Sequence, residues 1–184
     1  MRLRKIKNAQ ERLLDKLGLF VPNPEEYKGA WQKKFGNNNP IYIEIGMGKG
    51  KFIIEHAKRN KNINYIGIEK YDSVLIKGVE KASVEGLDNI YFLNVDAIKL
   101  CDYFKKGEVD KIFLNFSDPW PKTRHAKRRL TSEAFLKVYD NILDKKGDIE
   151  FKTDNIDLFE YSVQEFHRLD YNFLEFSCDL HRNN

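Results

Sequence analysis

Short apolar runs alternate with helical patterns from Ile41 to the end of the chain, and this alternation constrains the fold most strongly. Five runs have the length and composition of strands, at 41–45, 63–68, 90–93, 111–116 and 148–152. Helical patterns follow them, near 51–59, 72–84, 131–143 and 155–168. Alternating strands and helices form a mainly parallel sheet with helices on both faces. The sequence therefore predicts an α/β fold, and the segment Tyr171 to Cys178 is expected to add a final antiparallel strand or hairpin.

Length and composition indicate a single soluble domain. Of the 184 residues, 41% are hydrophobic and 33% are charged, as in ordinary globular proteins. Residues 1–40 have a basic start and many turn residues, so we expect a leader before a catalytic core at 41–184. No apolar run is long enough for a membrane span, and no signal-type core follows the N-terminus. We expect a cytoplasmic protein, monomer or homodimer, with no membrane partner.

Cysteine spacing and net charge give only weak information about the function of the protein. Cys101 and Cys178 have no metal-ligand or redox spacing, so both are expected to be mostly buried packing residues in a reducing compartment. No metal site is predicted. The net charge is only +4, because 28 acidic residues nearly balance 32 basic ones. The distribution of charge is therefore more informative about a polyanionic partner than the total.

A glycine-rich turn follows the first predicted strand and opens a helix. Gly46, Gly48 and Gly50 permit positive φ angles and close approach of a ligand to the backbone, and a helix N-terminus offers amide donors. Lys51 occupies the place of the third glycine in a dinucleotide fingerprint, which disfavours a nicotinamide dehydrogenase. Phe52 stands where a P-loop needs Ser or Thr. We predict a cofactor turn, with a tight turn that binds no ligand as the alternative.

Acidic residues mark three successive predicted strands. Glu44 lies inside an apolar strand, where a carboxylate is costly to bury without hydrogen bonds from backbone or ligand. Glu69 ends the second strand 23 residues after Gly46, a spacing at which a carboxylate can accept both hydroxyls of a ribose. An ordinary solvated glutamate is the less favoured alternative. Asp96 follows the third strand and could contact an adenine amino group or cap the next segment.

The fourth predicted strand leads into Asp118-Pro119-Trp120-Pro121. The two prolines restrict φ on either side of Trp120 and remove backbone donors, so the acid and the aromatic ring are presented rigidly. Ligands of open α/β sheets bind just past the carboxyl ends of the strands. We therefore predict a functional role for Asp118, whereas Trp120 taken alone is expected to be a core residue.

A cationic run without any acid occupies residues 122–129. Such a run is usually a solvated face. A basic loop beside a strand-end acid and opposite a cofactor site would instead neutralise the phosphates of an entering substrate. We expect His125 to contact a phosphate or the loop rather than to act as a base. The predicted phosphate contacts are Arg124, His125, Lys127, Arg128 and Arg129.

The fifth predicted strand ends at Thr153 and Asp154, before another helical pattern. Either side chain could cap that helix, because hydroxyl and carboxylate oxygens accept hydrogen bonds from the first turn. Either could also contact the substrate at the carboxyl edge of the sheet. From their chemistry alone, capping and substrate contact have equal weight.

Together these residues resemble the bacterial-type tRNA (guanine-N7)-methyltransferase family, which transfers methyl from S-adenosylmethionine to the variable-loop guanosine at tRNA position 46. The similarity runs from about Pro24 to His181, and its most specific parts are 115–122, 124–131 and 151–155. The resemblance implies a Rossmann-like S-adenosylmethionine-dependent methyltransferase fold. It also implies cofactor contact by Glu44, Glu69, Asp96 and Asp118, substrate contact by Lys122 and Asp154, and RNA contact by the basic run through Arg129.

Asp118 is the predicted catalytic residue. Guanine N7 carries an in-plane lone pair, so no proton has to leave before it attacks the sulfonium methyl. Catalysis then depends on in-line placement and on a carboxylate that stabilises the positive charge developing on the ring.

Two other functions fit the motifs. One is a methyltransferase acting on another RNA or on an exocyclic amine, since Asp-Pro-Trp resembles the Asp/Asn-Pro-Pro-Tyr turns of amino-methylating enzymes. The other is a non-catalytic RNA-binding protein with a vestigial cofactor fold, which the intact glycine turn and Glu69 disfavour. Family members usually continue into a Thr-x-Tyr-Glu segment that helps hold the target guanosine. This sequence ends at Asn184, so a missing C-terminal tail is expected.

Overall fold

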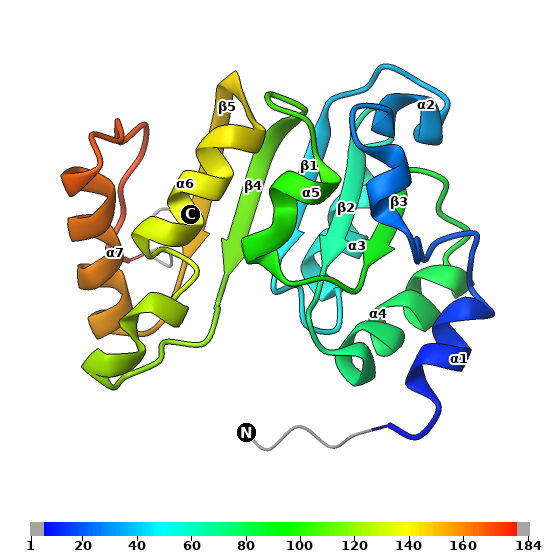
Figure 1. Cartoon of the computed structure of the whole chain (residues 1–184), viewed down its shortest axis with the longest axis horizontal. Coiled ribbons are helices and arrows are strands. Elements are labelled where there is room, and N and C mark those ends of the chain that lie inside the picture. Colours follow the sequence, from blue (N-terminus) through cyan, green and yellow to red (C-terminus); the bar gives the residue numbers. More distant parts are fainter. Residues whose placement is uncertain (1–5, 180–184) are drawn as a thin grey trace.

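One parallel sheet organises the chain (Figure 1). The computed structural model describes residues 6–179. The strands are β1 (Ile41–Ile45), β2 (Asn64–Ile68), β3 (Ile90–Leu93), β4 (Val109–Asn115) and β5 (Leu143–Lys152). Their order is β3-β2-β1-β4-β5, and every neighbouring pair is parallel. All carboxyl ends therefore lie at one edge of the sheet, the lower edge in Figure 1.

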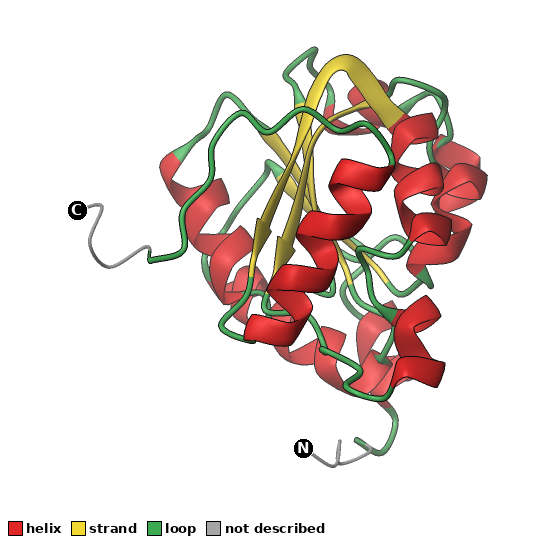
Figure 2. Ribbon diagram, turned by 90° about the vertical axis from the view of Figure 1, so that its left-hand side faces the viewer, coloured by secondary structure: helices red, strands yellow, loops and turns green. Residues whose placement is uncertain are grey.

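Helices cover both faces of this sheet, as the view in Figure 2 shows. The α-helices are α1 (Ala9–Leu14), α2 (Trp31–Phe35), α3 (Lys51–Arg59), α4 (Asp72–Val84), α5 (Leu100–Tyr103), α6 (Glu133–Ile142) and α7 (Ile156–Arg168). Short 3₁₀ helices are η1 (Pro24–Tyr27), η2 (Ala97–Lys99) and η3 (Thr123–Arg128). The predicted parallel sheet with helices on both faces is confirmed.

Two clusters of buried apolar side chains lie on the two faces of the sheet. One packs α1, α3 and α4 against the sheet, and the other contains residues of α5, α6 and α7. Both faces are covered, so the central strands are nearly continuous apolar runs, which made them visible in the sequence. The N-terminal segment joins both clusters, because Leu13, Phe20 and Trp31 are buried.

The strand β5 begins earlier than its apolar pattern predicts. The helix α6 runs directly into it at Leu143, which pairs with Val109 of β4. Residues 144–146 are exposed and charged, so their side chains give no signal of a strand. The pairing of Leu143 with Val109 starts the strand before this charged segment, and the regular pairing with β4 resumes at Asp148 with Lys111.

The predicted C-terminal strand is wrong within the described residues, which end at Asp179. Residues 171–179 form no strand. A strand needs a partner edge for its backbone, and this segment instead packs its aromatic rings on α7. The rings of Tyr171 and Phe166 are 5.3 Å apart, and those of Phe176 and Phe159 are 5.4 Å apart. Cys178 lies in this segment and is exposed, so its predicted burial is also wrong.

Membrane-spanning helices and metal-binding clusters are absent from residues 6–179. No helix in this range is long and apolar enough to cross a membrane. No group of three or more His, Cys, Asp or Glu side chains there could hold a metal ion.

Candidate active site

A large cleft lies at the carboxyl edge of the sheet, where the strand order reverses. The chain runs from β1 to β2 and β3 on one side, then returns to β4 on the other side of β1. This reversal leaves a crevice between the loops after β1 and β4. The cleft has a volume of about 2180 Å³, above the roughly 300–1,000 Å³ typical of small-molecule pockets. Among the predicted site residues, its walls contain Gly46, Gly48, Glu69, Asp96, Asp118, Lys127 and Arg128.

The glycine turn presents bare backbone to this cleft. Gly46 and Gly48 have φ angles of 71° and 59°, which side-chain-bearing residues rarely adopt. A Cβ atom at Gly48 would meet no atom within 4 Å, so the space beside its backbone is open to a ligand. Gly50 differs, because it is buried at the start of α3 and a Cβ there would lie 3.1 Å from Ile54 Cδ1. Its position serves the packing of α3 rather than the cleft wall.

Glu69 is a buried carboxylate fixed by two backbone donors. Only 8% of the residue is exposed, which excludes an ordinary solvated glutamate. Gly48 N–H donates to Oε2 at 3.1 Å, and Tyr71 N–H donates to Oε1 at 3.0 Å. Burial raises the pKa of Glu69, and the charge of Asp118 raises it further, against these backbone hydrogen bonds. Each oxygen keeps acceptor capacity for a further donor.

Asp96 caps a helix and also pairs with a lysine. Its Oδ1 accepts from Ile98 N–H at 3.2 Å at the start of η2, so the capping alternative is present in the structure. Its Oδ2 lies 2.7 Å from Lys70 Nζ. Burial acts to raise the pKa of Asp96, but the hydrogen bonds from Lys70 and Ile98 outweigh it and lower the pKa. Sequence reasoning missed Lys70, whose only signal is its place directly after Glu69.

Glu44 lies behind the glycine turn and outside the residues that line the cleft. It is 3% exposed, and Asn115 Nδ2 donates to its Oε1 at 3.1 Å. Its Oε2 and Asn115 Oδ1 have no hydrogen-bond partner among the described residues. Burial raises the pKa of Glu44 to about 7, against the hydrogen bonds from Asn115 and the Ile53 backbone. Sequence reasoning missed Asn115, which pairs with Glu44 across two strands.

The raised pKa predicts a pH dependence of stability without cofactor. The folded state holds a proton on Glu44 up to about pH 7, whereas the ordinary pKa is 4.5. Its stabilising contribution is complete below pH 4.5 and is lost as pH rises through 7, by on the order of 3 kcal/mol. We expect Glu44→Gln to remove this loss when unfolding free energies are measured in denaturant at pH 5 and 8. The exposed control Glu160→Gln should lose as much stability between pH 5 and pH 8 as wild type. An equal change in the free energy of unfolding for all three proteins would refute the assignment.

Asp118 stands exposed on a loop with unusual backbone angles. Two non-glycine residues there have positive φ, Phe116 at 50° and Trp120 at 44°. Trp120 is half-buried in the cleft wall, so its predicted core position is wrong. Its ring meets the Arg128 guanidinium at 4.9 Å and the edge of His125 at 5.7 Å. His125 therefore contacts the loop, which is one of the two roles expected of it, and its contact with RNA stays a prediction.

The basic run divides into exposed and buried members. Lys122, Arg124, Lys127 and Arg128 are exposed, and no ion pair involves them within the described part of the chain. Arg129 is 8% exposed, with its guanidinium on backbone carbonyls of the Asp118 loop. This burial does not fit a phosphate contact.

The helix after β5 is capped by Asn155, which sequence reasoning missed as a functional residue. Asn155 Oδ1 accepts from Leu158 N–H at 2.8 Å and caps α7. Thr153 Oγ1 accepts from Asn155 N–H at 3.1 Å, which shapes the turn before the cap. The capping alternative is therefore wrong for Thr153 and Asp154. Asp154 is exposed at the end of β5, next to the end of β4.

Comparison with known sequences identifies the family. A family model described as putative methyltransferase matches residues 38–183. A tRNA (guanine-N(7)-)-methyltransferase of Lachnoclostridium phytofermentans is 52% identical over 183 residues, covering 100% of this chain and 85% of that protein. The enzyme of that name from Bacillus subtilis is 48% identical over 184 residues, covering 100% and 86%. The chain belongs to the tRNA (guanine-N7)-methyltransferase family.

Solved structures agree on the fold. A 30S ribosomal A1408 methyltransferase from an uncultured bacterium aligns with a TM-score of 0.58 and 20% identity, over 84% of this chain and 80% of that one. The aminoglycoside resistance methyltransferase NpmB1 aligns with a TM-score of 0.57 and 21% identity, over 84% and 72%. These similarities confirm the predicted Rossmann-like methyltransferase fold of this family member.

Proposed function

We propose that the protein transfers a methyl group from S-adenosylmethionine to N7 of guanosine 46 in the variable loop of tRNA. Family membership supports the reaction, because the similar proteins above carry the name of this activity. The observation that carries the proposal is a single cleft in which Glu69, Asp118 and the exposed cations Lys127 and Arg128 meet. The reaction needs an acid that binds the cofactor, an acid that stabilises the charge on the target base, and cations that bind phosphates.

The residues around the glycine turn fit S-adenosylmethionine, which when bound supplies an electrophilic sulfonium methyl. Glu69 is buried, oriented by two amide donors and still able to accept from ribose hydroxyls. Gly48 leaves the backbone beside it open. Asp96 would accept from the adenine amino group through the oxygen that Lys70 contacts. Glu44 would add a hydrogen-bond acceptor for the cofactor, because its Oε2 has no partner among the described residues.

The chain places its substrate groups past β4 and β5. The exposed carboxylate of Asp118 stabilises the charge that develops on the guanine ring during transfer. Lys122, Thr153 and Asp154 contact the target nucleotide. Arg124, His125, Lys127 and Arg128 lie on or next to η3 and hold the tRNA backbone.

Mapping the methyl group on total tRNA tests this function. The purified protein, S-adenosylmethionine and unmodified tRNA should yield 7-methylguanosine in digested nucleosides, and strand scission at the modified base should map it to position 46. Another methylated nucleoside would establish the alternative RNA or exocyclic-amine methyltransferase. Absence of both methylation and S-adenosylmethionine binding would establish the non-catalytic RNA-binding protein.

The exposed cations predict a change in the salt dependence of tRNA binding. Lys127→Ala together with Arg128→Ala should weaken binding, and each lost phosphate contact should lower the log–log slope by roughly 0.7–0.9. Affinity for S-adenosylmethionine should stay the same. The matched control replaces Lys145 and Lys146, which are exposed at the opposite end of β5, and should leave the slope unchanged. An equal slope in both double variants would mean that the basic run is only a solvated face.

A further inference from the structure

The loop that carries Asp118 has little internal support. Residues 117–121 make no backbone–backbone hydrogen bond within the described part of the chain. Pro119 and Pro121 have no N–H to donate. The positive φ angles of Phe116 and Trp120 add strain of about 1–3 kcal/mol each at such positions. A loop of this kind keeps one conformation only where surrounding groups hold it.

Arg129 supplies the missing hydrogen bonds from outside the loop. Its Nε donates to the Pro119 carbonyl at 3.0 Å, and its Nη2 donates to the Trp120 carbonyl at 3.2 Å. The guanidinium carbon lies 4.2 Å from the ring centroid of Tyr161 on α7. One planar group thus links the two residues after Asp118 to a helix, a geometry that lysine cannot reproduce.

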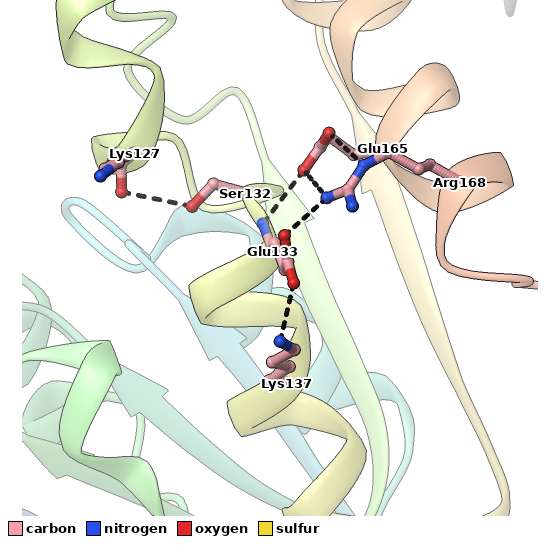
Figure 3. A network of polar contacts seen from close by, with 6 residues as sticks. All are labelled: Lys127, Ser132, Glu133, Lys137, Glu165 and Arg168. Atoms are coloured by element: carbon pink, nitrogen blue, oxygen red, sulfur yellow. Dashed lines mark hydrogen bonds and ion pairs between the residues drawn. The ribbon is translucent and has the colours of Figure 1, made fainter.

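The backbone on either side of Arg129 is itself anchored to two helices (Figure 3). The Ser132 hydroxyl donates to the Lys127 carbonyl at 3.2 Å, which closes the end of η3 onto the start of α6. Arg168 of α7 bridges Glu133 and Glu165 at 2.8 and 3.1 Å. The backbone just before Arg129 is therefore held at the start of α6, and α6 is in turn held to α7.

We propose that Arg129 is a positioning residue that holds the loop of residues 117–121 and thereby sets the place of Asp118. Its burial and its contacts with two carbonyls and one ring leave it no role in phosphate binding, unlike its exposed neighbours Lys127 and Arg128. The kinetic part of this inference rests on the proposed methyl transfer, whereas the structural part does not.

Two measurements on tRNA separate positioning from phosphate contact. Arg129→Ala should lower the single-turnover rate with saturating tRNA and cofactor by on the order of tenfold to a hundredfold, and leave the salt slope of tRNA binding unchanged. Arg129→Lys should recover part of the rate. The comparison variant Lys127→Ala should lower the slope by roughly 0.7–0.9. A lowered slope with a normal rate for Arg129→Ala would overturn the proposal.

A spectroscopic measurement tests, without any reaction, whether Arg129 holds the loop of residues 117–121. The chain has two tryptophans, so fluorotryptophan labelling gives two ¹⁹F resonances, with the fully buried Trp31 reporting on the fold. Arg129→Ala should shift or broaden the Trp120 resonance alone. Tyr161→Leu, which removes the ring under the guanidinium, should act in the same direction, and Tyr161→Phe should not. These results test the role of Arg129 in holding the loop even if wild-type protein methylates no tRNA. They also test it if Arg129→Ala fails to fold, because Tyr161→Leu removes a contact of the same guanidinium. An unmoved Trp120 resonance in folded Arg129→Ala or Tyr161→Leu would refute it.

Discussion

Asp118→Asn is expected to lower the rate of methyl transfer by on the order of a hundredfold or more. The guanine base is neutral before the reaction and cationic after N7 is methylated. A fixed carboxylate therefore interacts more strongly with the transition state than with the ground state, and only such differential binding raises the chemical rate. The amide keeps the shape of the side chain and loses its charge. Affinities for S-adenosylmethionine and tRNA should change much less than the rate.

Single-turnover methylation with saturating tRNA and cofactor isolates this step. Asp88→Asn is a matched control, because Asp88 is exposed at the amino-terminal end of β3, away from the carboxyl edge. It should transfer methyl at the wild-type rate. A near wild-type rate for Asp118→Asn would make Asp118 a structural turn residue and remove the catalytic centre from this loop.

Glu69→Ala is expected to abolish detectable binding of S-adenosylmethionine in a protein that still folds. Hydrogen bonds to a charged acceptor contribute roughly 1.5–3 kcal/mol each, so loss of two ribose contacts weakens affinity by more than a hundredfold. The structure adds a second effect. Glu69 also accepts from the Gly48 amide, so its removal frees the glycine turn that faces the cofactor.

Isothermal titration with S-adenosylmethionine measures this loss, and circular dichroism checks the fold. Glu160→Ala, which changes an exposed glutamate on α7, should bind with wild-type affinity. Glu69→Gln should be intermediate, since the amide oxygen keeps one acceptor and loses the charge. Wild-type affinity in a folded Glu69→Ala protein would exclude Glu69 from the cofactor site.

The sequence by itself determined the core elements and the edge at which the site lies. Apolar runs located the strands from β1 to β4 closely, because strands buried on both faces need apolar side chains along their whole length. The glycine turn and Glu69 could also be predicted from the sequence, because a positive-φ turn and a strand-end acid at fixed spacing depend on local backbone chemistry. The same local signals failed where side chains carry no pattern, as at the charged start of β5.

Only the tertiary structure decided which side chains share a contact. Arg129 is chemically like Arg128 and adjacent to it, yet one is buried on the Asp118 loop and the other is exposed in the cleft wall. Glu44 and Asn115 are 71 residues apart and meet because β4 pairs with β1. Such contacts depend on the order of strands and on which face of a loop meets a helix. Burial and long-range pairing are properties of the assembled sheet and helices, and no periodicity within one segment encodes them.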